Sequence, residues 1–220
     1  MKEKSLSISF ADSLAEESIS CIREYAEIGL DAIMEDGILK DIPIVSTAIT
    51  LYKIGSSIKE RHNLKKLLVF LNEINNGIVD EQKRKEYQQR FQSNEKFRNR
   101  EIEYLFVLID RYISYDKPQL LAKLYLAYLE DIIIWDELIM YAEVVDRLFS
   151  QDIKMLCEGL LDKIHYSKIP HNYYRLEANG LLYKNEAETR VENETLYLDT
   201  EDKKFTLTDF GSKLVQILSH

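Results

Sequence analysis

The chain has 220 residues, of which 45% are hydrophobic and 30% charged, with 7 Gly and 3 Pro. A chain of this length can bury a stable core without a disulfide or a metal, and a composition poor in turn formers is typical of a mainly helical globular protein. The formal net charge of -9 argues against nucleic acid as a partner, because an acidic surface repels phosphate.

The first 20 residues contain acidic side chains where a signal peptide needs an apolar centre. No window reaches the roughly 18 uncharged apolar residues of a membrane-spanning helix. Cys21 and Cys157 lie far apart and have no CxxC partner. We therefore expect a cytoplasmic protein without a spanning helix, a disulfide framework or a zinc knuckle.

The first helices are predicted from the spacing of apolar residues. Residues 13–36 follow the three-and-four spacing of an amphipathic helix that ends at Gly37. Asp41 can cap a second helix, which takes Pro43 in its first turn, where a missing amide donor costs nothing. This helix, or a successor, continues until Asn75, Asn76 and Gly77 stop it.

The second helix combines a wide apolar face with a basic end, and this end belongs to the only basic part of the chain. Residues 53–100 hold 12 Lys and Arg against 6 Asp and Glu. An apolar face beside cations can contact anionic lipid or a partner helix, but the same face can equally be covered by neighbouring helices in a core. The candidate contact residues are Ile44, Val45, Ile49, Tyr52, Lys59, Arg61, Lys65 and Lys66.

More helices are expected along the middle of the chain. Leu64, Leu67, Leu68, Leu71 and Ile74 form an apolar stripe. Within residues 80–100, an exposed helix followed by a turn at residues 93–94 is predicted from the polar composition. Buried helices are then predicted over residues 101–114, 117–130 and 131–149, and another starts at residue 150.

The last part of the chain loses the helical period after Pro170. Residues 195–198 and 205–207 are predicted to be short strands, and a final helix is expected from Thr208 or Asp209. The pattern LEANGLL, two strands and FTLTDFGSKLVQIL resembles the end of a winged-helix domain. Leu176, Gly180, Leu181 and Leu182 match its turn into the first strand, and Leu207, Thr208, Gly211 and Leu214 match its closing segment.

The fold predicted from these segments is mainly α. A multi-helix bundle over residues 1–165 would be followed by a small winged-helix-like α+β domain over residues 166–220. Acidic residues crowd this second domain, whereas a DNA-reading wing needs Lys and Arg. We therefore expect it to contact a protein rather than DNA.

A longer resemblance covers most of the chain. The segments IPIVSTAITLYKIGSSIKERHNLKKLLVFLNEI, YLFVLIDRY, DKPQLLAKLYLAYL and VVDRLF resemble a group of small uncharacterised bacterial helical proteins with an apolar Ile-Pro helix and a basic second helix. No activity is implied by this resemblance. The apolar helix leading into a basic one is also loosely similar to cell-death and phage-defence effectors that perturb membranes.

Motifs of common enzymes are not found. The sequence has no GxxxxGK[ST], GxGxxG, HExxH or GxSxG motif, and it predicts no catalytic residues and no cofactor. Cys157, His165 and His171 fit no common ligand spacing, so no metal site is predicted.

Two hypotheses follow from the sequence. The first is a non-enzymatic bacterial effector, for example in phage defence, that acts through its apolar-plus-basic helix on a membrane surface or a partner helix. The second is a soluble adaptor or regulator that self-associates through its helical domain and whose winged-helix-like end binds a protein in preference to DNA. Binding to anionic vesicles would separate the two.

Overall fold

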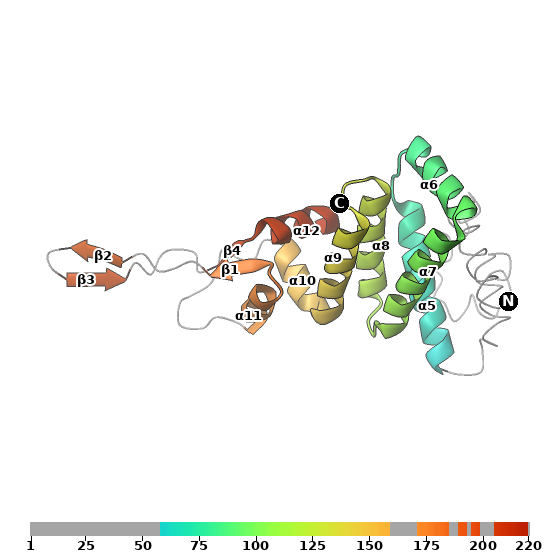
Figure 1. The fold of residues 1–220 in the computed structure, drawn as a ribbon. Helices are drawn as coiled ribbons and strands as arrows, with labels where there is room; N and C mark the ends of the chain where they lie inside the picture. Colours follow the sequence, from blue (N-terminus) through green and yellow to red (C-terminus); the bar gives the residue numbers. More distant parts are fainter. Residues whose placement is uncertain (1–57, 159–170, 185–188, 193–194, 199–204, 220) are drawn as a thin grey trace. The chain divides into compact units, whose positions relative to one another are not determined.

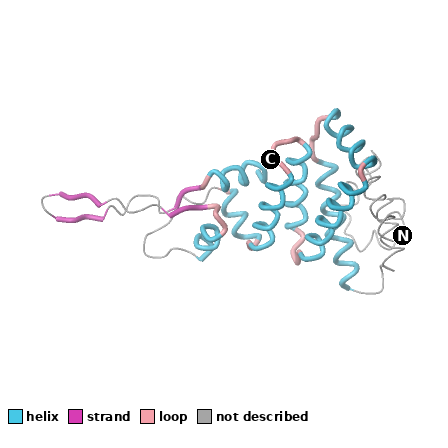
Figure 2. The backbone as a smooth tube through the Cα atoms, viewed as in Figure 1, coloured by secondary structure: helices cyan, strands magenta, loops and turns pink. Residues whose placement is uncertain are grey.

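The computed structural model describes residues 58–158, 171–184, 189–192, 195–198 and 205–219. Helices α5 to α12 make up most of this described part, and within it strands occur only after residue 180 (Figures 1 and 2). The prediction of a mainly helical protein is confirmed.

The chain divides into two compact units, residues 1–142 and residues 143–220. This division falls within a helix, whereas the sequence placed a domain boundary after residue 165. Each unit is described by itself below.

The first unit contains five helices in its described part. They are α5 (Ile58–Asn76), α6 (Glu81–Ser93), α7 (Glu95–Arg111), α8 (Asp116–Leu129) and α9 (Trp135–Arg147), the last of which continues into the second unit. Helix α5 packs along α8 and also contacts α7, while α6 lies beside α7 (Figure 1). The apolar stripe predicted for α5 is buried, as are apolar side chains of the helices that it faces: Leu64, Leu67, Leu68, Leu71, Ile74, Leu105, Leu121 and Tyr125.

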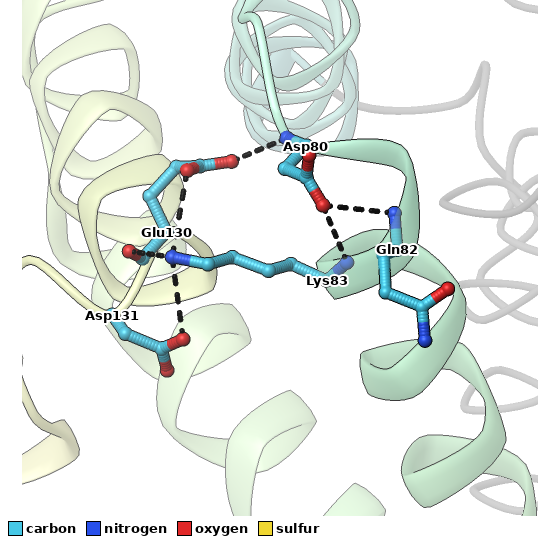
Figure 3. A network of polar contacts seen from close by, with 5 residues as sticks. All are labelled: Asp80, Gln82, Lys83, Glu130 and Asp131. Carbon is cyan, nitrogen blue, oxygen red and sulfur yellow. Dashed lines mark hydrogen bonds and ion pairs between the residues drawn. The ribbon is translucent and has the colours of Figure 1, made fainter.

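Side-chain caps fix the start of α6. The Asp80 carboxylate accepts hydrogen bonds from the backbone N–H groups of Gln82 and Lys83, at 2.9 and 3.1 Å. The Asp80 N–H donates to the Glu130 carboxylate, and Lys83 Nζ donates to the Glu130 carbonyl oxygen, each at 2.5 Å. Lys83 Nζ also lies 3.4 Å from Asp131 (Figure 3). These contacts connect the start of α6 to the end of α8.

The predicted start of the helix over residues 131–149 is wrong, because residues 131–133 form the turn that closes α8. Asp131 has a φ of 56°, and the N–H groups of Ile132 and Ile133 donate back to the Ala127 carbonyl oxygen. Such a turn closes a helix by satisfying its last carbonyl groups. Helix α9 therefore begins only at Trp135.

The second unit combines helices with two pairs of antiparallel strands. After the end of α9 it contains α10 (Ser150–Cys157), α11 (His171–Ala178), β1 (Leu182–Lys184), β2 (Thr189–Glu192), β3 (Thr195–Leu198), β4 (Phe205–Leu207) and α12 (Asp209–Ser219). The two expected strands are present as β3 and β4, but each pairs with a strand earlier in the chain. Leu182 lies opposite Leu207 in the β1–β4 pair, and Glu192 lies opposite Thr195 in the β2–β3 pair.

A junction of backbone groups connects the end of α11 to the start of α12. Gly180, with a φ of 74°, ends α11 in the left-handed region that favours glycine. Thr208 Oγ1 donates to the Gly180 carbonyl oxygen at 2.6 Å and accepts the Gly211 N–H at 2.9 Å. The Thr208 N–H donates to the Leu181 carbonyl oxygen at 3.1 Å. Helix α12 thus starts against the strand that follows α11.

Candidate functional site

The structure describes only part of the predicted apolar-plus-basic helix. Ile44, Val45, Ile49 and Tyr52 lie outside the described residues. Lys59 is exposed in the first turn of α5. Arg61 belongs to the same helix, but its side chain lies outside the described part. The proposed contact surface is therefore seen only at its basic end.

Two lysines of this basic end are engaged within the first unit. Lys65 Nζ lies 4.7 Å from the centre of the Tyr115 ring. Lys66 is 1% exposed, and its Nζ donates to the carbonyl oxygens of Asp110 and Tyr112, at 2.8 and 2.7 Å. Because the last carbonyls of a helix lack intrahelical partners, Lys66 caps the end of α7. Lys66 therefore does not lie on the basic surface expected from the sequence.

Burial disfavours the charged form of Lys66, and one nearby charge partly offsets this effect. Burial lowers the pKa of the Lys66 ammonium, the Asp110 carboxylate opposes this shift, and the Lys59 charge adds to it.

Within the described residues, no helix is long and apolar enough to cross a membrane.

A buried carboxylate in the first unit was not predicted. Glu101 of α7 is fully buried and accepts hydrogen bonds from three tyrosine hydroxyls. Tyr87 of α6 donates to it at 2.5 Å, and Tyr125 and Tyr128 of α8 donate at 2.9 and 2.8 Å. The Tyr87 and Tyr125 hydroxyls also contact each other. We call these four residues the Glu101 cluster.

The protonation of the Glu101 cluster follows from its burial. Burial raises the pKa of the Glu101 carboxyl, while the tyrosine hydrogen bonds and the Arg100 guanidinium, 3.8 Å away, oppose this rise without cancelling it. Burial also raises the pKa values of all three tyrosine hydroxyls, and the Glu101 charge adds to the rise. The hydroxyls therefore stay protonated and serve as donors to the carboxylate.

The Glu101 cluster joins three helices through one polar centre. Because Glu101 has no exposed surface, a solute cannot reach its carboxylate without an opening of the unit. A satisfied buried carboxylate of this kind fixes one arrangement of the surrounding helices. One signal for the cluster is present in the sequence, since Tyr125 and Tyr128 are three residues apart on one helix. Nothing in the sequence placed Tyr87 and Glu101 opposite them.

A second buried carboxylate lies in the second unit. Asp152 of α10 is 0% exposed and accepts two hydrogen bonds from Arg175 of α11, from Nε at 2.9 Å and from Nη2 at 2.6 Å. Asp152 also accepts the Phe149 N–H at 3.2 Å. The Arg175 guanidinium lies 4.9 Å from the centre of the Phe149 ring. This bidentate ion pair connects α10 to α11 and engages the guanidinium group of Arg175.

Neither unit shows a metal centre in the part of the chain that the structure describes, where no group of three His, Cys, Asp or Glu side chains converges. Comparisons with protein-family models, with curated proteins and with solved structures gave no match to this chain.

Proposed function

We propose that the protein is a non-enzymatic adaptor or regulator whose second unit is winged-helix-like and binds a protein rather than DNA. One observation carries this proposal: Arg175 is the only Lys or Arg of α11, and its guanidinium is held by the buried Asp152. The helix that would read DNA in such a domain then has no free guanidinium to contact phosphate or a base edge.

The order of elements supports a winged-helix-like unit. Helix α11 is followed by β1, the β2–β3 pair, β4 and the closing helix α12. Three residues on which the resemblance depends lie at helix ends: Gly180 follows α11, and Thr208 and Gly211 lie at the start of α12. The charge favours a protein partner, since residues 182–207 hold seven Asp and Glu against four Lys and Arg.

Two exposed tyrosines make the best candidate contact surface on this unit. Tyr174 of α11 is 47% exposed and Tyr183 of β1 is 49% exposed. The Tyr174 ring stands edge-on to the buried Phe205, with ring centres 6.1 Å apart. Tyrosines that are held by a packed core supply contact area at a low entropic cost, and they are enriched at protein interfaces.

Site-specific crosslinking tests this proposal. We would place the photoreactive residue p-benzoylphenylalanine at position 174 or 183 of the full chain, and at the exposed position Ser212 of α12 as a matched control. Discrete adducts should form from positions 174 and 183 and not from position 212. The partner identified from these adducts should then be purified. It should bind the Tyr174→Ala variant about tenfold more weakly than it binds the wild type, as expected for loss of an interface aromatic.

The same chain should be titrated with duplex DNA at two salt concentrations. Binding that weakens steeply with salt, together with equal crosslinking from position 212, would overturn the proposal and favour a nucleic-acid-binding module.

A further inference from the structure

The most basic part of the described chain lies on α6 and the start of α7. Residues 81–100 hold seven Lys and Arg against three Glu. This charge plays no part in the proposed function, which concerns the second unit.

Several of these cations already have partners. Arg98 is 8% exposed, and its Nη1 donates to the carbonyl oxygens of Phe91 and Gln92, at 3.1 and 3.2 Å, where α6 ends. Lys83 is engaged at the end of α8, and Lys85 pairs with Glu81. These three cations serve the structure of the unit.

Arg90 and Arg100 differ from the other cations because both lie against the same aromatic ring. The Arg90 guanidinium carbon is 4.0 Å from the centre of the buried Phe97 ring, and the Arg100 guanidinium carbon is 5.6 Å from it. Arg100 also lies 4.8 Å from the centre of the Trp135 ring. Among the described residues, no carboxylate forms an ion pair with Arg90, and Arg100 approaches only Glu101, at 3.8 Å.

The two guanidinium groups also act on one hydroxyl group. Burial and Glu101 raise the pKa of the Tyr128 hydroxyl, and the charges of Arg90 and Arg100 both oppose that rise. The Tyr128 ring contacts the Trp135 ring at 5.5 Å between centres. Arg90, Arg100, Trp135 and Tyr128 are therefore linked by successive ring contacts, and Tyr128 connects them to Glu101.

Aromatic contact holds a guanidinium in a fixed plane and leaves its N–H groups pointing outward from the ring edge. Two such groups present fork-shaped donors that match the tetrahedral oxygens of a phosphate. A phosphate monoester carries nearly two negative charges at neutral pH, whereas a carboxylate carries one. Two guanidinium groups therefore match the charge of a phosphate monoester better than that of a carboxylate.

We propose that Arg90 and Arg100, held on Phe97 and Trp135, form a binding site for the phosphate group of a small phosphate monoester. The net charge of the chain does not oppose this binding, because charges beyond about 8 Å are largely screened at physiological ionic strength. The two guanidinium groups at the site dominate the local potential.

Calorimetric titration of the full chain tests the site, with tryptophan fluorescence as a second readout. Trp135 is the only tryptophan, so its emission reports on the ring that Arg100 contacts. The probes are inorganic phosphate and adenosine monophosphate, each compared with sodium chloride at matched ionic strength. We expect saturable binding of both phosphates that changes the emission of Trp135, and no saturable effect of chloride.

Variants decide whether the two arginines carry the binding. Arg90→Gln and Arg100→Gln should each weaken phosphate binding about tenfold or more, as expected for a lost charged hydrogen bond. Arg90→Lys keeps the charge but lacks the fork, so it should weaken binding as well. Lys96→Gln removes one exposed cation of the same helix and should leave the affinity unchanged. Thermal melting at the wild-type temperature would show that each variant is folded.

Three outcomes would overturn the proposal. They are absence of saturable binding of either phosphate, weakening by Lys96→Gln equal to that by Arg90→Gln, and full affinity of the folded Arg90→Lys variant. The first outcome would mean that no site exists, and the other two would mean that the protein attracts anions through diffuse charge alone. Adenosine monophosphate binding more tightly than inorganic phosphate would support the site and extend it to the nucleoside part.

Discussion

Glu101 shows how a single residue can fix the arrangement of three helices. A buried carboxylate without partners would cost several kcal/mol, but three tyrosine hydroxyls from α6 and α8 satisfy its oxygens. Burial still dominates and raises the pKa of this carboxyl. We therefore expect the cluster to contribute more to the specificity of helix packing than to net stability.

The raised pKa of Glu101 predicts a pH dependence of folding. A carboxyl group whose pKa is higher in the fold than in the unfolded chain adds stability at pH values below the unfolded pKa. This contribution is lost as the pH rises through the native pKa, by up to about 1.4 kcal/mol per pH unit. Glu101→Gln cannot ionise. We therefore expect the stability of the wild type relative to Glu101→Gln to fall as the pH rises above about 4.5.

Urea unfolding of both proteins at a series of pH values from 4 to 8 would measure this difference. Glu103→Gln is the matched control, because Glu103 is exposed on the same helix, and its stability should run parallel to that of the wild type. Parallel profiles for Glu101→Gln and the wild type would contradict the prediction.

At the scale of elements, the second unit depends on close contact between the end of α11 and the start of α12. Thr208 bonds to backbone groups of both segments, and Gly211 lies buried against the Leu181 carbonyl oxygen, where a Cβ would overlap that oxygen. Glycine within a helix normally costs about 1 kcal/mol relative to alanine. Its presence here has a steric reason.

Gly211→Ala should therefore destabilise the protein, although alanine is the better helix former. Because the obstacle is backbone rather than a flexible side chain, we expect a loss of about 1–3 kcal/mol in the free energy of unfolding. Thermal unfolding would measure it as a lower Tm. Ser212→Ala, at the next and exposed position of α12, is the control and should not lower the Tm. A Tm for Gly211→Ala at or above that of the wild type would show that the Leu181 backbone yields to the added methyl group.

At the scale of the whole molecule, the structure changes how a membrane role should be tested. Reversing all four cations of the α5 region would include Lys66, whose buried ammonium caps α7. A buried carboxylate in its place would face carbonyl oxygens and destabilise the fold. Loss of vesicle binding by that variant would then not separate membrane contact from unfolding.

The informative variant reverses Lys59, Arg61 and Lys65 and keeps Lys66. We expect the wild type and this triple Glu variant to co-sediment equally little with anionic vesicles, since Lys66 is buried and Lys65 lies over Tyr115. Neutral vesicles and high salt are the controls. Salt-sensitive sedimentation of the wild type that is lost in the triple variant would contradict this expectation, and it would favour the hypothesis of a membrane-active effector.

Within the described part of the chain, the sequence by itself determined the positions of most helices, because apolar spacing and caps act locally. The stop at Asn75, Asn76 and Gly77 and the turn at residues 93–94 follow from such local signals, and the structure confirms both. The final helix also starts where Thr208 and Asp209 predicted it. The start of α9 was predicted too early, because the N–H groups of Ile132 and Ile133 bond to the Ala127 carbonyl oxygen at the end of α8.

Only the tertiary structure decided which polar side chains meet. Glu101 looked like an ordinary helix residue, and Lys66 like one of four surface cations, until packing of α7 against its neighbours buried both. Arg90 and Arg100 likewise became a pair only through Phe97, which lies between them in sequence and beside both in space. Helical spacing predicts which face of a helix is buried, but it does not predict which side chains of the neighbouring helix pack against that face.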